Sequence, residues 1–227
     1  ADPAKDQSYT FYGQTQAQLR RTLTPLGDYR KDQVRELARR LGLPVADKPD
    51  SQEICFIPDG DYRAFLAAYR PESRRPGPVV DLQGRVVGEH PGIAFFTIGQ
   101  RRGLGLALGY PVYVVDIDPD RNAVVVGSDR DLLREEVLVD RVNWVAIPEL
   151  TGPLEVTARI RYHAPDAAAV IEPAGEGRVL TRFREPQRAV TPGQAVVWYR
   201  DDLVVGGGVA VRTPHPAAVA AARAGAY

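Results

Sequence analysis

Residues 195–211 read AVVWYRDDLVVGGGVAV, and this stretch decides the fold of the C-terminal half. Two apolar runs, Ala195–Tyr199 and Leu203–Val211, flank the turn residues Arg200–Asp202, which is the pattern of two strands joined by a hairpin. Three glycines at 206–208 lie inside the second run. Glycine within a strand indicates a bulge or a close approach of another backbone, so we expect one of these here.

Similar short runs precede this hairpin at regular intervals. The predicted strands lie at residues 137–144, 154–161, 168–172 and 178–183. Turn residues such as Pro173–Gly177 separate them. Regular spacing of many short strands with turns between them is typical of a closed barrel, and we predict a barrel over this region.

Residues 79–127 also show strand patterns with a period of two. They predict two hairpins, 79–81 with 85–89 and 111–117 with 123–127. Between the hairpins, the pair Arg101–Arg102 lies among glycines and follows Gln100. Glycines permit close backbone approach and guanidinium groups bind phosphate, so the two arginines are candidates for contact with a phosphate or a nucleotide edge. The alternative is a tight loop with two solvated arginines.

The start of the chain carries helical patterns. Thr15, with Gln18 three residues later, has the pattern of a capping box and predicts a short helix that runs through Leu23. The clearest helix spans residues 31–41, where apolar residues recur at helical spacing.

The limits of two helices can also be predicted. Arg30 precedes the helix at 31–41 but is a poor N-cap, so Asp28 is expected to start that helix earlier. Asp61 is expected to cap a third helix, which Pro71 ends.

These patterns predict an α+β chain that is mostly β. The proline- and glycine-rich run at 71–78 is the best candidate linker, so a boundary is expected there. The predicted parts are a helical segment at 1–75, a small β-rich central domain at 76–136, a β-barrel at 137–212 and a tail at 213–227.

Composition limits the function classes. The 29 basic and 29 acidic residues give a net charge of zero, which argues against nucleic-acid binding driven by bulk charge but leaves room for a local basic face. Neither a membrane span nor a signal peptide is evident, so no membrane association is expected. A single cysteine excludes an intrachain disulfide framework and fits a reducing compartment, so a cytoplasmic location is expected.

The one cysteine, Cys55, lies in DKPDSQEICFI at residues 47–57. Its polar lead-in and apolar end predict a loop followed by a short strand. A free cysteine here is either a small buried hydrophobe or an accessible nucleophile or sulfur carrier. Spacing alone leaves both interpretations open.

A series of ordered blocks resembles the tRNA-specific 2-thiouridylases, which replace the C2 oxygen of the wobble uridine with sulfur. The blocks are AKDQSY at 4–9, PLGDY at 25–29, DSQEICFI at 50–57, FTIGQRRGL at 96–104, AVTPGQA at 189–195 and GGG at 206–208. The resemblance extends to about Arg212. It implies that residues 1–75 form the end of a nucleotide-binding domain. It also implies that the barrel has six strands and is similar to the second domain of elongation factors.

The resemblance also implies roles for individual residues. Cys55 would carry the sulfur as a persulfide. The implied tRNA contacts are Lys5, Asp6, Gln7, Arg161, Tyr162 and Gln194. Gln100, Arg101 and Arg102 would contact tRNA or order their loop. The alternative for each of these residues is an ordinary turn or surface position.

The implied reaction uses ATP to activate the uridine, and a persulfide-donating sulfur-relay protein or a cysteine desulfurase to load Cys55. No metal is predicted. The sequence contains no SGGxDS-type pyrophosphate loop and no second cysteine to form the resolving disulfide. We expect both on a missing N-terminal nucleotide-binding domain, so this chain alone should not thiolate tRNA. The alternatives are a noncatalytic RNA-binding module and a persulfide carrier that does not act on RNA.

Overall fold

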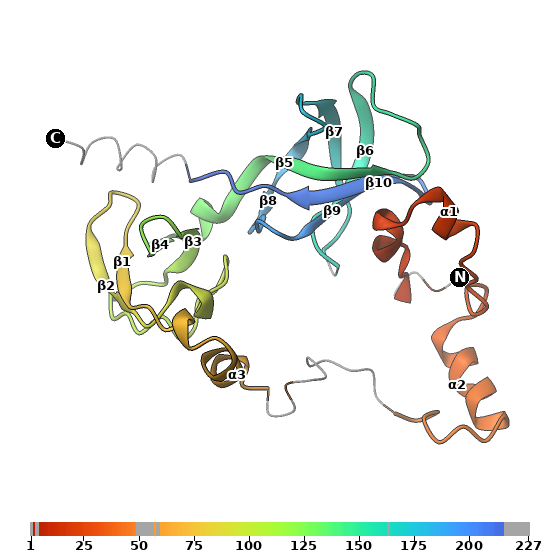
Figure 1. Cartoon of the computed structure of the whole chain (residues 1–227), viewed down its shortest axis with the longest axis horizontal. Helices are drawn as coiled ribbons and strands as arrows, with labels where there is room; N and C mark the ends of the chain where they lie inside the picture. Colours follow the sequence, from red (N-terminus) through yellow and green to blue (C-terminus); the bar gives the residue numbers. More distant parts are fainter. Residues whose placement is uncertain (1, 3–4, 49–56, 58–59, 163, 216–227) are drawn as a thin grey trace.

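The computed structural model describes residues 2, 5–48, 57, 60–162 and 164–215. Within these residues the protein is mostly β, with a closed six-stranded barrel and a separate four-stranded sheet. The barrel lies between this sheet and the N-terminal helices η2 and α1 (Figure 1). The predicted fold class is therefore confirmed, whereas the likeness to elongation factors stays a prediction.

The barrel consists of six antiparallel strands in the order β10-β5-β8-β7-β6-β9. The strands are β5 (Leu133–Trp144), β6 (Leu154–Arg159), β7 (Ala167–Pro173), β8 (Val179–Arg188), β9 (Ala195–Arg200) and β10 (Leu203–Ala210). All six predicted strands are present. β5 starts earlier and β8 ends later than predicted, because Leu133 pairs with Arg188.

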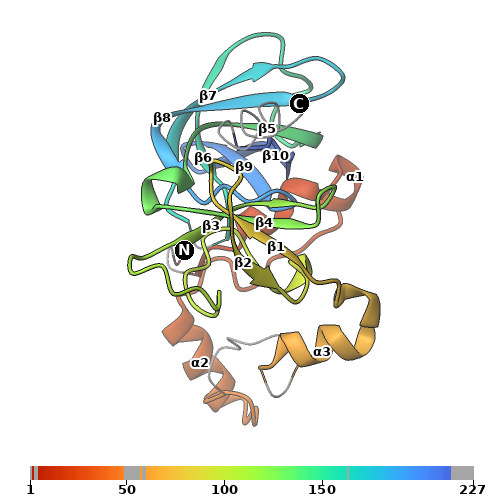
Figure 2. The same cartoon turned by 90° about the vertical axis from the view of Figure 1, so that its left-hand side faces the viewer.

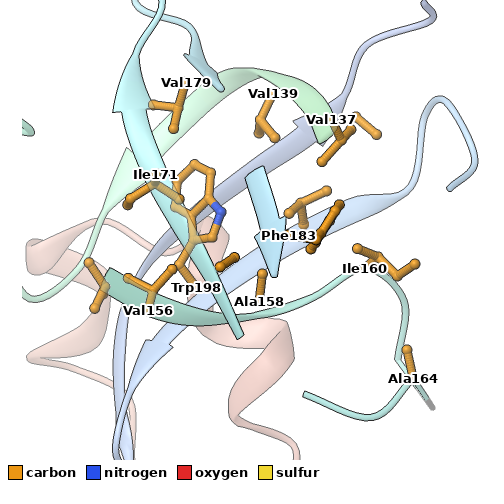
Figure 3. Close-up of a cluster of buried hydrophobic side chains, with 14 residues drawn as sticks. Val137, Val139, Val156, Ala158, Ile160, Ala164, Ile171, Val179, Phe183 and Trp198 are labelled. Carbon is orange, nitrogen blue, oxygen red and sulfur yellow. The ribbon is translucent and has the colours of Figure 1, made fainter. Parts of the chain in front are cut away.

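The barrel interior is filled by large apolar side chains (Figure 3). Trp198 is fully buried, and its indole N–H donates a 3.0 Å hydrogen bond to Thr181 Oγ1. Trp144 stacks on it with ring centroids 5.4 Å apart. Because the one polar atom of this indole has a partner, the large apolar ring is buried without leaving an unsatisfied donor.

The glycine run 206–208 lies where β10 crosses its two neighbours. A Cβ on these three residues would lie 2.5, 2.7 and 2.4 Å from the carbonyl oxygens of Asn143, Val196 and Asp140, respectively. The register of β10 also shifts against both β5 and β9 within this part of the strand. Both the close approach and the irregularity expected from the sequence are confirmed.

The four-stranded sheet has the order β2-β1-β4-β3, with β1 parallel to β4. Its strands are β1 (Gly77–Val80), β2 (Val86–His90), β3 (Tyr113–Asp118) and β4 (Ala123–Gly127). Buried Val114, Val124 and Phe95 form part of its core, and α3 (Tyr62–Tyr69) packs on it. Figure 2 shows the sheet in front of the barrel.

The N-terminal segment contains η2 (Ser8–Gly13), α1 (Gln16–Leu19) and α2 (Lys31–Arg40). The capping box of α1 is confirmed, since Thr15 N–H donates to Gln18 Oε1 and Gln18 N–H donates to Thr15 Oγ1. The extension of α1 through Leu23 is wrong. Thr22 Oγ1 donates to Gln18 O at 2.9 Å and satisfies a carbonyl that a longer helix would use.

The start of α2 also differs from the prediction. Arg30 is the N-cap residue and Asp28 does not start the helix. Arg30 N–H donates to Gln33 Oε1 at 2.8 Å, and Lys31 N–H donates to Asp2 Oδ2 at 3.0 Å. The first N–H groups of a helix have no partner within the helix, and here Asp2, which is distant in the sequence, accepts a hydrogen bond from one of them.

Candidate functional site

The predicted tripeptide Lys5–Gln7 lies directly before η2 and against the barrel. Gln7 Nε2 donates a hydrogen bond to the hydroxyl of Tyr162. Asp6 accepts hydrogen bonds from the backbone and hydroxyl of Ser8, at 2.9 and 2.7 Å. One of its oxygens also lies 3.5 Å from Arg159 Nη1. Residues more than 150 positions apart therefore form one polar surface.

Tyr9 anchors this segment to the barrel. Its side chain is buried, and its hydroxyl donates to Ala195 O at 2.7 Å, next to Gln194. Its ring centroid lies 6.1 Å from that of Tyr162. Burial, with smaller contributions from Tyr12 and Tyr199, raises the pKa of Tyr9 to about 12, so the hydroxyl keeps its proton at neutral pH.

Arg159 is the centre of the contacts around this segment. Its Nε and Nη2 bind the two carboxylate oxygens of Asp166 at 2.8 and 2.9 Å, and its Cζ lies 4.9 Å from the ring centroid of Tyr199. The hydrogen bonds that Arg159 donates to Asp166 raise the pKa of Arg159 above its ordinary value. Burial acts to raise the pKa of Asp6, but hydrogen bonds from Ser8 and the charge of Arg159 lower it overall. Asp6 is therefore ionised at neutral pH.

The outer part of the surface remains available for a ligand. Arg161 and Gln194 are exposed, and Tyr162 is 37% exposed. Within the described residues, neither the Arg161 guanidinium nor the Gln194 side-chain amide has a hydrogen-bond partner. A cation, an aromatic ring and an amide next to one another can bind a phosphate, a base face and a base edge.

The structure thus brings together the six predicted tRNA contacts, which we call the barrel surface: Lys5, Asp6, Gln7, Arg161, Tyr162 and Gln194. Sequence reasoning missed Arg159 and Tyr9, which hold this surface in place. The sequence did contain one signal for Arg159. Asp166 follows it at the other end of a short connection between two predicted strands, where an acid can pair with an arginine.

Residues Gln100–Arg102 lie elsewhere, in the loop that leads to β3. Gln100 Oε1 accepts from Thr97 N–H at 3.1 Å, and its Nε2 donates to Arg102 O at 2.9 Å. These two bonds support a loop-ordering role for Gln100. Arg101 and Arg102 are exposed, and within the described residues their guanidinium groups have no partner.

Cys55 lies outside the described residues, and described residues that precede and follow it in the sequence are held in place. Ala46 and Ile57 are buried. Asp47 Oδ1 accepts hydrogen bonds from Arg39 Nε and Nη2 at 3.0 and 2.8 Å. Asp61, which follows Cys55 in the sequence, caps α3 by accepting from Ala64 N–H at 2.9 Å, as predicted.

Two kinds of feature are absent from the described part of the chain. No group of three or more His, Cys, Asp or Glu side chains that could hold a metal ion occurs there. No helix in the same residues has the length and apolar character needed to cross a membrane.

Three family models match the chain in succession. They are described as a tRNA methyl transferase HUP domain at residues 1–59, a tRNA methyl transferase PRC-barrel domain at 63–128 and an aminomethyltransferase beta-barrel domain at 134–210.

Curated relatives share these regions at high identity. The chain is 57% identical to the tRNA-specific 2-thiouridylase MnmA of Moorella thermoacetica over 91% of its own length and 58% of the relative. It is 55% identical to the enzyme of the same name from Heliobacterium modesticaldum, over 93% of the chain and 55% of the relative. It is 53% identical to the enzyme of the same name from Desulforamulus reducens, over 93% of the chain and 58% of the relative. The chain therefore spans a little over half the length of these relatives.

Proposed function

Because this chain belongs to the tRNA-specific 2-thiouridylase family, we propose that it is the tRNA-binding and sulfur-transferring part of such an enzyme. The proposed substrate is the wobble uridine of tRNA, and the proposed location is the cytoplasm. The observation that carries the proposal is the barrel surface, where the N-terminal tripeptide contacts the barrel through Gln7 and Tyr162.

We assign the sulfur step to Cys55. Its persulfide attacks C2 of a uridine whose O2 carries AMP from ATP; a C–S bond forms, the C2–O bond breaks and AMP leaves. A second cysteine thiolate then attacks the Cys55 sulfur, which breaks the S–S bond, leaves sulfur on the base and forms a disulfide. A thiol reductant then opens this disulfide, and a persulfide-donating sulfur-relay protein or a cysteine desulfurase transfers sulfur to the freed Cys55 thiol.

We assign the ATP-binding site and the second cysteine to the remainder of the nucleotide-binding domain. The sequence of this chain has neither an SGGxDS-type loop nor a second thiol. Part of the HUP domain is present at residues 1–59. The apolar stripe of α2 supports this arrangement, because Val34, Leu37 and Ala38 are half-buried and Leu41 is 65% exposed. We propose that the remainder of the domain covers this stripe.

The first test measures binding of an unmodified tRNA transcript with a wobble uridine by fluorescence anisotropy. Tyr162→Ala should weaken binding about 5-fold or more, because stacking of one base on an aromatic ring contributes ~1–3 kcal/mol. Arg161→Ala should lower the salt slope of binding by about 1 if Arg161 contacts phosphate. The matched control is Arg178→Ala, since Arg178 lies in the turn at the opposite end of the barrel. Equal affinities of the wild type, Tyr162→Ala and Arg161→Ala would contradict the binding surface.

The second test addresses Cys55. With ATP, a persulfide donor and the nucleotide-binding domain of the Moorella thermoacetica relative, we expect 2-thiouridine from the wild-type chain and none from Cys55→Ser, with unchanged tRNA binding. The chain alone should form no product. Activity of Cys55→Ser would favour a noncatalytic RNA-binding module, and absence of any tRNA binding would favour a persulfide carrier that does not act on RNA.

A further inference from the structure

A second candidate site lies in the loop between η4 (Ile93–Phe95) and β3. Residues of this loop line a groove of about 400 Å³ that is open to solvent, which we call the loop groove. Arg101 and Tyr110 line its rim, and Leu104 and Val112, both buried in the core of the four-stranded sheet, lie at its base. The loop belongs to the sheet on one side of the barrel, whereas η2 lies on the other side (Figure 1).

Hydrogen bonds fix the two ends of this loop. Gln100 fixes its start through Thr97 and Arg102, and Val114 N–H donates to Gln100 O at 2.9 Å. Gly105 and Gly109 have φ values of +68° and +77°, a region that side chains disfavour. A Cβ on either glycine would meet no atom within 4 Å, so backbone conformation and not crowding requires glycine there. The loop that borders the groove therefore has fixed ends and carries glycine where its backbone needs a positive φ.

The chemistry of the loop groove matches a nucleotide. Tyr110 is 66% exposed, and the Arg101 guanidinium has no ionic partner within the described residues. No acidic side chain is among the groove-lining residues. An exposed aromatic ring stacks with a base, an unpaired guanidinium binds a phosphate, and the volume falls in the range of small-molecule sites. An anionic ligand with a flat aromatic part satisfies all of these features.

We propose that the loop groove holds one unpaired nucleotide of the bound RNA, with its base stacked on Tyr110 and its phosphate paired with Arg101. This inference rests on the proposed function, because tRNA is the RNA concerned. The groove and the barrel surface then contact the same molecule at two separate points. Linked contacts of this kind raise affinity beyond that of either alone.

The test uses the full chain and the unmodified tRNA transcript with a wobble uridine. Tyr110→Ala should weaken binding about 5-fold or more and Tyr110→Phe should leave it unchanged, because stacking requires the ring and not the hydroxyl. Arg101→Ala should lower the salt slope by about 1, as expected for loss of one phosphate contact. Tyr69→Ala and Arg121→Ala are the matched controls, since both residues are exposed and neither lines the groove. Thermal midpoints of all variants check that they fold.

A second readout locates the contact directly. Ultraviolet cross-linking of a 5-bromouridine-substituted transcript, followed by mass spectrometry, should yield a peptide that contains Tyr110. The inference is overturned if Tyr110→Ala and Arg101→Ala bind like the controls. If those variants bind normally while Tyr162→Ala is weakened, only the groove assignment falls. If no form of the chain binds tRNA, the proposed function falls as well.

A protein occupant would give a different pattern. Reduced binding of a persulfide-donor protein by Tyr110→Ala, with unchanged tRNA affinity, would assign the groove to that partner and overturn the inference.

Discussion

Arg159 holds the residues of the barrel surface in place, although it is largely buried and is not one of them. Its side chain is only 17% exposed, yet it pairs with Asp166 and Asp6 and covers the ring of Tyr199. Lysine carries the same charge but cannot form the two-pronged contact with Asp166. The position of the tripeptide therefore depends on the shape of a guanidinium group as well as on its charge.

The glycine run gives a prediction at the same scale. Gly208→Ala would place a methyl group 2.4 Å from Asp140 O and 2.7 Å from Val139 Cγ1. Because the backbone oxygen cannot move freely, we expect a loss of about 1–3 kcal/mol in the free energy of unfolding, measured by urea denaturation. Gly152→Ala is the control, since a Cβ there meets no atom within 4 Å. Equal stability of the two variants would contradict the close approach.

At the scale of elements, strand patterns predict this fold well because strands such as β6 and β7 have a buried and an exposed face, whereas β9 and β10 are continuous apolar runs that are buried on both faces. In β6, for example, buried Val156 and Ala158 alternate with more exposed neighbours, and this period is visible in the sequence. The limits of elements are less predictable where distant contacts set them. β5 begins early because Leu133 pairs with Arg188, and α2 begins at Lys31 because Asp2 accepts from its N–H.

The cap of α3 allows a test at this scale. Asp61 follows the segment with Cys55 and accepts a hydrogen bond from Ala64 N–H. Asp61→Ala should lower the free energy of unfolding by about 0.5–2 kcal/mol and accelerate hydrogen exchange of the Ala64 amide, since the cap is lost. Asp61→Asn retains a capping oxygen and should remain close to wild type. Slow exchange in Asp61→Ala would show that the cap is dispensable.

At the scale of the whole molecule, the chain beyond β10 connects the barrel with the four-stranded sheet. Arg212 Nε donates to Ile117 O at 3.0 Å, and its Nη2 lies 3.3 Å from a carboxylate oxygen of Asp116. Asp116 is buried and also accepts from His215 N–H at 3.1 Å. These contacts fix the relative position of the two β units.

This connection should respond to pH. Burial, and secondly the charge of Arg134, lower the pKa of His215, while Asp131 and Asp116 oppose the shift. A lowered pKa means that the unfolded chain binds the proton more readily, so stability is complete above the unfolded pKa of 6.5 and falls as the pH drops through it. The urea midpoint of the wild type should therefore decrease between about pH 7.5 and pH 5.5.

His215→Gln isolates this contribution, because it retains a polar side chain without a titrating group. Its urea midpoint should decrease less over the same pH range. Identical pH profiles for the two proteins would assign the change to other groups.

The candidate site is predictable from sequence only in part. The resemblance supplies the six residues of the barrel surface, but no local pattern brings Gln7 to Tyr162, since their contact depends on closure of the barrel and on burial of Tyr9. The sequence did not predict the loop groove itself. Of its two rim residues, Arg101 was a candidate contact and Tyr110 was not. Tyr110 was missed because an aromatic residue in a glycine-rich loop has no periodic pattern to show whether it is buried or exposed.

The glycine run 206–208 in β10 also affects how the N-terminal segment packs on the barrel. A Cβ on Gly207 would come within 2.9 Å of the Tyr12 ring, so η2 rests on the barrel where the wall has no side chain. The tripeptide Lys5–Gln7 directly precedes η2. A methyl group at position 207 would thus push the tripeptide away from Tyr162. Under the proposed function, we expect Gly207→Ala to lower the affinity for RNA, although Gly207 is not part of the barrel surface.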